Sequence, residues 1–189
     1  MPHKHETHSK TKISKYMSYL LRHNPENLNM DKNGFVSLKG LLEKLNERFQ
    51  VDENFIREIA EKSDKKRFEL VGDKIRALYG HTITVEIKFE EDKTMKRLYH
   101  GTTADAAYKI LKTGLKPMKR KWAHLSPTIE VAMEVGLRKA RKPVILEIDA
   151  EAARKDKIRF YKATDKVYLC DYVPPKYIRC LRRQTKKKA

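Results

Sequence analysis

Residues 68–78 read FELVGDKIRAL and contain two short runs in which apolar and polar side chains alternate. The runs are residues 68–71 and 74–78, and only Gly72 and Asp73 separate them. Alternation is typical of half-buried strands, and a two-residue connection that contains glycine is a strong hairpin signal. These eleven residues therefore predict a β-hairpin.

Three helices are predicted before this hairpin. Apolar residues 13, 17, 20 and 21 share one face of a first helix, which ends at Asn24-Pro25 because the residue before proline avoids helical backbone. Ser37 and Asp52 are suitable N-caps for the second and third helices. Three helices followed by a hairpin is the order of a winged-helix module, but such modules bind nucleic acids or proteins, so the order alone does not assign a function.

The rest of the chain predicts a mixture of strands and helices. Residues 84–89 are expected to form a strand and residues 90–96 a charged connector, which places a domain boundary after residue 92. The predicted domains are 1–92 and 93–189, and the fold class is α+β. Further strands are expected at 98–99, 144–148, 158–161, 167–170 and 177–181, with helices between Thr103 and Gly114 and within 126–140.

The strongest compositional feature is positive charge. The 189 residues include 43 lysines and arginines against 25 acidic residues, for a formal net charge of +18. Such a field attracts polyanions, so RNA or DNA is the expected class of partner. The alternative is a solvated lysine-rich surface, and the run Lys186, Lys187 and Lys188 fits a solvated tail.

Several other classes of protein are disfavoured. The two cysteines, Cys170 and Cys180, are too few for a disulfide framework and indicate a reducing compartment. No apolar run approaches the roughly 18 residues of a membrane span, and the N-terminus lacks the apolar region of a signal peptide. We expect a cytoplasmic protein with no membrane partner and no metal, since His3, His5 and His8 form only a weak tract.

Basic residues stand at three points that could serve chemistry. Arg22 and His23 follow the apolar face of the first helix. Arginine forms two-point contacts with phosphate, and histidine exchanges a proton near neutral pH. Arg76 alternates with apolar neighbours in the hairpin, and Arg138 stands near the end of a later helix. Each also has an ordinary interpretation, as a cation at a helix C-terminus or as a solvated strand arginine.

A further candidate is the triplet His100-Gly101-Thr102 at the end of a predicted strand. Glycine permits close backbone approach to a ligand, and the flanking side chains can hydrogen-bond to sugar hydroxyls. Taken alone, three such residues also fit an ordinary turn. The Gly-rich phosphate-binding motifs GxxxxGK[ST] and GxGxxG are absent from the sequence.

Seven segments taken together resemble the Tpt1/KptA family of RNA 2′-phosphotransferases. They are SKYMSYLLRH, DKNGFVSLKGLL, KIRALYGHT, LYHGT, HLS, EVGLRKARKPVILEID and VYLCDYVPPKYI, which occur in the family's order between Ser14 and Ile178. The resemblance implies a winged-helix-like RNA-binding lobe followed by an ADP-ribosyltransferase-like lobe. It also implies consumption of NAD as co-substrate, with an ADP-ribosylated RNA intermediate and with nicotinamide and ADP-ribose 1″,2″-cyclic phosphate as products.

The resemblance also assigns roles to residues. The catalytic set is Arg22, His23, Arg76 and Arg138, and the NAD-binding set is His100, Gly101, Thr102, Arg120 and Ser126. The implied partner is an RNA that carries an internal 2′-phosphate, tRNA being the expected one, and the expected oligomeric state is a monomer. Three positions depart from the family pattern: Tyr79 replaces a common glutamine, Trp122 a histidine and Cys170 a threonine.

Two other functions remain open on the sequence. One is an ADP-ribosyltransferase that caps terminal phosphates of RNA or DNA. The other is a winged-helix protein that binds nucleic acid without catalysis, although the intact Arg22, His23, Arg76 and Arg138 favour an enzyme. The identity of the products separates these functions.

Overall fold

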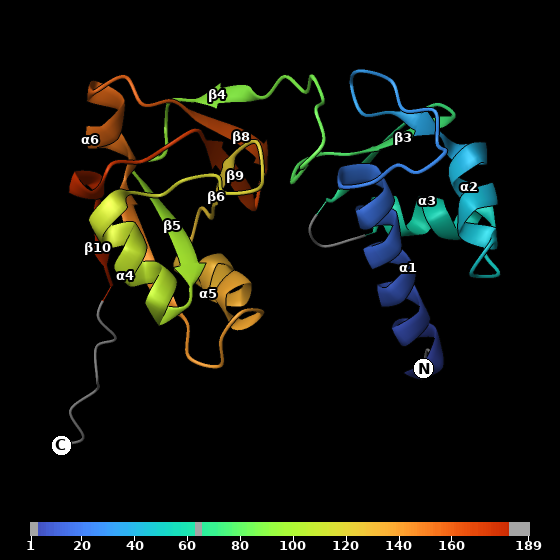
Figure 1. The fold of residues 1–189 in the computed structure, drawn as a ribbon, viewed down its shortest axis with the longest axis horizontal. Coiled ribbons are helices and arrows are strands. Elements are labelled where there is room, and N and C mark those ends of the chain that lie inside the picture. Colours follow the sequence, from blue (N-terminus) through green and yellow to red (C-terminus); the bar gives the residue numbers. More distant parts are fainter. Residues whose placement is uncertain (1–3, 63–65, 182–189) are drawn as a thin grey trace. The chain divides into compact units, whose positions relative to one another are not determined.

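The computed structural model describes residues 4–62 and 66–181, which form two compact units that divide between Lys88 and Phe89. Figure 1 labels most of the helices and strands of both units. The boundary predicted from the sequence lay four residues later, after Asp92. His3 and the lysine run at 186–188 lie outside the described residues, as do the side chains of His5 and His8.

The first unit consists of helices and one small antiparallel sheet. Its elements are α1 (Lys4–Arg22), β1 (Val36–Ser37), α2 (Leu38–Asn46), α3 (Glu53–Glu61), β2 (Phe68–Val71) and β3 (Lys74–Ala77). The sheet has the order β1-β3-β2, and Gly72, with φ +60°, lies in the predicted hairpin turn. Both predicted caps are confirmed: the Ser37 side chain accepts a hydrogen bond from Gly40 N, and the Asp52 side chain accepts one from Phe55 N.

The core of the first unit lies between α1, α2, α3 and the hairpin. The predicted apolar face of α1 is confirmed, because Ile13, Met17, Leu20 and Leu21 are all fully buried. Ile75 and Ala77 of β3 are buried in the same cluster. Since side chains alternate along a strand, Arg76 lies on the opposite face of the hairpin from this core.

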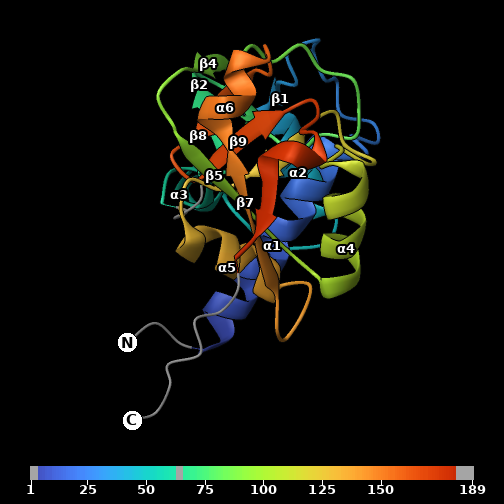
Figure 2. The ribbon, with the colours of Figure 1, turned by 90° about the vertical axis from the view of Figure 1, so that its left-hand side faces the viewer.

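The second unit contains two antiparallel sheets. Its elements are β4 (Glu90–Asp92), β5 (Arg97–Thr102), α4 (Ala104–Thr113), β6 (Ala123–Leu125), α5 (Ile129–Leu137), β7 (Val144–Asp149), α6 (Ala150–Lys155), β8 (Phe160–Thr164), β9 (Val167–Cys170), the 3₁₀ turn Pro175–Tyr177 and β10 (Ile178–Cys180). The sheet orders are β10-β7-β5 and β4-β8-β9-β6. Figures 1 and 2 show β5 and β7 lying between α4 and α5. The α+β prediction is therefore confirmed as a mixed fold with antiparallel sheets.

Two local predictions are wrong. Residues 84–89 do not form a strand: Glu86 N donates to Lys32 O, so this stretch runs along the first unit without joining a sheet. The expected connector 90–96 begins with β4, which pairs with β8. The pattern also gave no signal for β1, β6 or α6, which are short elements that form through tertiary pairing and packing.

Close packing of α5 on β5 organises the second unit. A Cβ atom at Gly101 would lie 1.8 Å from Ala132 O, and one at Gly136 would lie 2.5 Å from Pro143 Cβ. Gly101 is therefore required where the backbone of α5 approaches the strand, and Gly136 is required where the helix meets Pro143. Among the described residues, no helix is long and apolar enough to cross a membrane.

Gly101→Ala is expected to destabilise the second unit severely, by more than about 3 kcal/mol, because a methyl group cannot share the space of a backbone oxygen. Thermal unfolding followed by circular dichroism, with hydrogen exchange of the α5 amides, measures the effect. Gly72→Ala is the matched control: nothing lies within 4 Å of its Cβ position, so only backbone strain of about 1–2 kcal/mol remains. Equal losses in the two variants would contradict the packing argument.

Candidate active site

The first predicted pair lies where α1 ends. Arg22 is the last residue of the helix, and its carbonyl accepts hydrogen bonds from Thr82 N at 2.9 Å and Ile83 N at 3.4 Å. His23 Nδ1 lies 3.0 Å from Thr82 Oγ1, and the His23 side chain is exposed. The segment that follows the hairpin therefore closes the C-terminal end of α1, where the helix dipole favours cations.

The same segment supports the guanidinium of Arg22. Its Cζ lies 4.9 Å from the centroid of the Tyr79 ring, a cation–π contact. Gly80 has φ +90°, and a Cβ there would lie 3.6 Å from Arg22 Cδ and Nη1. The left-handed backbone at Gly80 thus turns the chain past the arginine side chain. Tyr79, the departure from the family's glutamine, acts here as a platform for Arg22.

Arg76 is held on the outer face of the hairpin by three contacts. Its Nε donates to Glu69 Oε2 at 2.6 Å, its Nη1 donates to Asn33 O at 3.2 Å, and its Cζ lies 4.4 Å from the centroid of the Phe35 ring. Glu69 faces Arg76 directly across the two strands. The guanidinium is therefore fixed in position, and the interpretation of Arg76 as a freely solvated strand arginine is wrong.

His100 anchors the candidate site of the second unit. It lies within β5, paired with Leu146, so the triplet 100–102 is part of a strand and is not a turn. Its Nδ1 lies 2.9 Å from His124 O, and because a carbonyl only accepts, Nδ1 carries the hydrogen. Burial lowers the pKa of His100, and the charge of Lys139 adds to this, against the opposing hydrogen bond to His124. The imidazole is neutral at pH 7, with Nε2 as a hydrogen-bond acceptor.

The other candidate residues of the second unit lie on several elements around β5. Ser126 exchanges two backbone hydrogen bonds with Tyr99, and both Ser126 and Thr102 are buried. Arg138 is the C-cap of α5, two residues after Gly136, whose backbone lies against Gly101. Arg120 is exposed in the loop between α4 and β6, and no described contact joins it to this group. Gly101 itself serves the packing of α5, a role that the sequence argument did not consider.

Two of the departures from the family pattern have structural roles. Trp122 packs edge-on against Tyr161, with ring centroids 5.2 Å apart, and against Phe89 at 6.4 Å. Cys170 is fully buried in β9, and burial raises the pKa of its thiol to about 12. The thiol therefore stays protonated and unreactive at neutral pH.

Comparison with known proteins identifies the family. The model of the Tpt1/KptA family, described as RNA 2′-phosphotransferase, matches residues 8–172. The chain belongs to the Tpt1/KptA family. A probable RNA 2′-phosphotransferase of Thermococcus kodakarensis is 46% identical over 167 residues, covering 87% of this chain and 93% of the relative. Another, of Acetivibrio thermocellus, is 42% identical over 174 residues, covering 89% and 96%.

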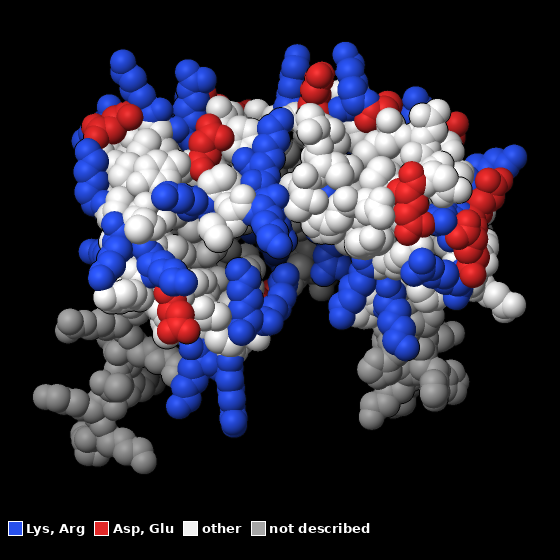
Figure 3. Space-filling view, in the orientation of Figure 1, with Lys and Arg blue, Asp and Glu red and all other residues white. Residues whose placement is uncertain are grey.

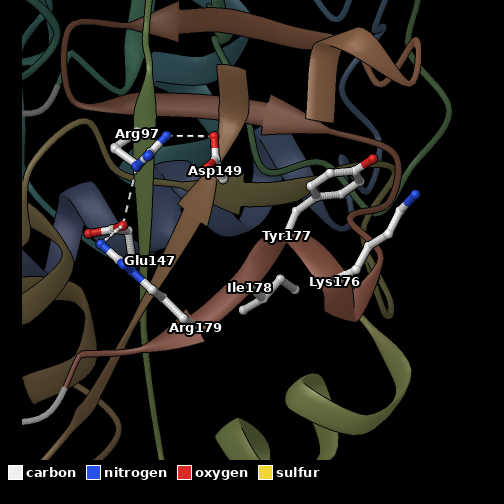
Figure 4. Close-up of a pocket in the computed structure, with 7 residues that line it drawn as sticks. All are labelled: Arg97, Glu147, Asp149, Lys176, Tyr177, Ile178 and Arg179. Carbon is white, nitrogen blue, oxygen red and sulfur yellow. Dashed lines mark hydrogen bonds and ion pairs between the residues drawn. The ribbon is translucent and has the colours of Figure 1, made fainter. Parts of the chain in front are cut away.

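The second unit also contains a pocket that is lined by none of the candidate site residues (Figure 4). There Arg97 pairs with Asp149 at 2.5 Å, and the buried Glu147 pairs with Arg179 at 2.6 Å and Arg97 at 3.3 Å. Asp149 also caps α6. Because its cations are paired with carboxylates, this pocket offers little net charge to an anionic substrate, and its ion pairs join β5, β7 and β10.

Sequence reasoning missed the groups that hold the candidate residues. Glu69 had a usable signal, because a two-residue hairpin turn sets the register that places it opposite Arg76. Thr82 had none, since its contact with His23 spans 59 positions and depends on the tertiary path of the chain. The carbonyl groups of Asn33 and His124 are likewise invisible in a pattern of side chains.

The lowered pKa of His100 predicts a pH dependence of stability. The unfolded histidine titrates near 6.5 and the folded one below it, so the unfolded state binds more protons between these values. The free energy of unfolding should therefore fall as the pH drops below about 6.5. Denaturation midpoints between pH 5 and 8 measure this fall.

His100→Asn is the matched variant, since its amide nitrogen can replace Nδ1 as the donor to His124 but does not titrate. It should lose the part of the pH dependence that His100 contributes. A variant with the wild-type profile would show that His100 has no lowered pKa.

Proposed function

We propose that this protein is an NAD-dependent RNA 2′-phosphotransferase that moves an internal RNA 2′-phosphate to NAD. The observation that carries the proposal is the extent of the family match: residues 8–172 include all nine predicted site residues from both units. We assign the first unit as a winged-helix-like RNA-binding lobe, in line with three helices and the sheet β1-β3-β2. We assign the second unit as an ADP-ribosyltransferase-like lobe.

The proposed reaction has two steps. In the first, a 2′-phosphate oxygen attacks the anomeric carbon of the nicotinamide ribose; the glycosidic bond breaks, and nicotinamide leaves with the bonding electrons. In the second, the 2″-hydroxyl of that ribose attacks phosphorus, the bond to the RNA 2′-oxygen breaks, and the hydroxyl proton passes to the 2′-oxygen. The products are nicotinamide, RNA with a free 2′-hydroxyl, and ADP-ribose 1″,2″-cyclic phosphate.

Arginine suits both steps because negative charge persists on the phosphate and grows on the leaving oxygen in the second. A guanidinium stabilises this charge without losing its own, and it acts best when its position is fixed beforehand. Two arginines are fixed in this way. The guanidinium of Arg22 lies over the Tyr79 ring, and that of Arg76 is hydrogen-bonded to Glu69 and to the carbonyl of Asn33. We assign both to the phosphate, with His23 as a phosphate ligand or proton carrier.

The second unit suits the nicotinamide ribose of NAD. A neutral His100 with its hydrogen on Nδ1 presents Nε2 as an acceptor for a ribose hydroxyl. Thr102 lies two residues along β5 from His100, and Ser126 forms backbone hydrogen bonds with the neighbouring Tyr99. We assign both, with Gly101 and the loop residue Arg120, to NAD binding. Arg138, at the end of α5, is assigned to the phosphorus centre in the second step. In this proposal the arginines supply the cationic charge that a metal ion supplies in other phosphotransferases.

Incubation of the purified protein with an oligoribonucleotide that bears one internal 2′-phosphate, with and without NAD, tests the proposal. Mass spectrometry is expected to show NAD-dependent loss of the phosphate together with nicotinamide and ADP-ribose cyclic phosphate. ADP-ribose retained on RNA or DNA ends as the final product would instead show a capping enzyme. RNA that is bound but unchanged would overturn the enzyme proposal. A tRNA with the same modification, used in the same assay, tests the expected substrate.

Arg138→Ala is expected to slow the second step by about 10²–10³-fold and to accumulate ADP-ribosylated RNA, because the loss of one electrostatic donor falls on the developing phosphorane charge. Quenched-flow separation of the RNA species measures both steps. Arg141→Ala, an exposed arginine in the same stretch, is the control and should match the wild-type protein. Equal slowing of nicotinamide release and phosphate removal would contradict a role in the second step.

A further inference from the structure

A ladder of flat side chains runs along one face of α1 toward His23. Tyr16 and Tyr19 stack with ring centroids 6.3 Å apart and planes 13° apart, and Tyr19 and His23 follow at 6.5 Å. At the other end, Arg48 Cζ lies 4.4 Å from the centroid of the Tyr16 ring. Tyr19 follows Tyr16 by three residues, and His23, the residue after the end of α1, follows Tyr19 by four, so the three rings lie one above another along the helix surface.

Part of this ladder is open to solvent. Tyr19 is 42% exposed, although it is a large aromatic side chain, and Arg48 and His23 are exposed as well. Tyr16, by contrast, is half-buried and packs against the core and against Phe49, so it forms the base on which Tyr19 rests. The Tyr19 hydroxyl accepts a hydrogen bond from Asn24 Nδ2 at 3.2 Å, which helps to fix the ring.

The same face of α1 carries lysines for which the described residues show no ion pair, unlike a lysine nearby on the same helix. Lys12 and Lys15 are exposed, and helical spacing places each one turn before Tyr16 or Tyr19. Within residues 4–62 and 66–181, no ion pair is recorded for Lys12, Lys15 or Arg48, whereas Lys10 pairs with Glu58 at 2.8 Å. Figure 3 shows lysine and arginine side chains standing over the region labelled α1 in Figure 1.

We propose that this face of α1 binds the single-stranded RNA that flanks the 2′-phosphate. Bases stack on the exposed faces of Tyr19 and Arg48, and Lys12 and Lys15 contact the phosphates of the backbone. The inference rests on the proposed function, which supplies an RNA substrate and a reactive phosphate near His23. Single strands are bound in this way by other proteins, since aromatic and guanidinium planes accept any base and cations follow the backbone. The exposed cations Lys12, Lys15 and Arg48 give this face an excess of positive charge, which favours a polyanion over a protein as the partner.

Binding of a fluorescein-labelled 12-residue single-stranded oligoribonucleotide without a 2′-phosphate tests the surface, with the full chain and no NAD. Tyr19→Ala is expected to weaken binding about fivefold or more, the effect of losing one stacked base, and Tyr19→Phe should retain most of it because the ring remains. Tyr108→Ala is the matched control: Tyr108 is 62% exposed on α4 with Lys112 Nζ 4.3 Å from its ring centroid. Equal affinity of wild type and Tyr19→Ala, or equal weakening by Tyr108→Ala, would overturn the proposal.

The salt dependence of the same binding tests the lysines. The slope of log affinity against log salt is negative, and it should become shallower by about 1.4 in Lys12→Gln/Lys15→Gln, since each phosphate contact on a single strand contributes about 0.7 to its magnitude. Lys109→Gln/Lys112→Gln, on the exposed side of α4, should keep the wild-type slope. If the slope became shallower by the same amount in both double variants, only the overall charge would attract RNA, and the assignment of Lys12 and Lys15 would be overturned.

These measurements separate the surface from the reaction. The probe has no 2′-phosphate and needs no NAD, so the binding result stands even if the transfer assay fails. If the wild-type protein transfers the phosphate, Tyr19→Ala should raise the KM for the oligonucleotide substrate in proportion to its weaker binding. A KM equal to that of the wild-type protein would overturn the proposal that this face of α1 binds RNA, and it would leave the proposed function intact.

Discussion

The candidate chemistry of the first unit depends on how the C-terminal end of α1 is closed. A helix leaves its last carbonyl groups without partners inside the helix, and here Arg22 O is satisfied by Thr82 N and Ile83 N. This closure brings Tyr79 under the Arg22 guanidinium and Thr82 against His23. Backbone hydrogen bonds that stabilise the fold therefore also position two side chains for which phosphate binding is proposed.

The second unit positions its candidate residues by a different constraint, the close approach of two backbones. Glycine at 101 lets α5 lie directly against β5, and glycine at 136 leaves room for Pro143 against the same helix. Arg138 follows that contact by two residues. Burial lowers the pKa of His100, and the charge of Lys139 adds to this. The packing of a helix on a strand thus helps to set both the location of a cation and the protonation state of a half-buried histidine.

The distribution of ion pairs distinguishes structural charges from available ones. Arg97, Glu147, Asp149 and Arg179 neutralise one another and tie strands together, as do Arg154 and Asp92 near β4. On α1, Lys12 and Lys15 have no recorded acidic partner among the described residues. The net charge of +18 therefore combines cations that tie strands together through ion pairs with others, such as Lys12 and Lys15, that have no such pair in the described part of the chain.

The sequence by itself determined the elements that follow from local rules. The hairpin at 68–78, the caps Ser37 and Asp52 and the buried face of α1 each depend on residues within a few positions, so alternation, capping chemistry and helical spacing were sufficient. The motifs that assign the family are likewise short and ordered along the chain. Only the tertiary structure decided what those rules cannot reach. The irregular path of 84–89, the ion pair of Glu69 with Arg76, the hydrogen bond of His23 with Thr82 and the need for glycine at 101 arise from groups brought together by folding. Such contacts depend on distances in space, and a pattern along one chain does not contain them.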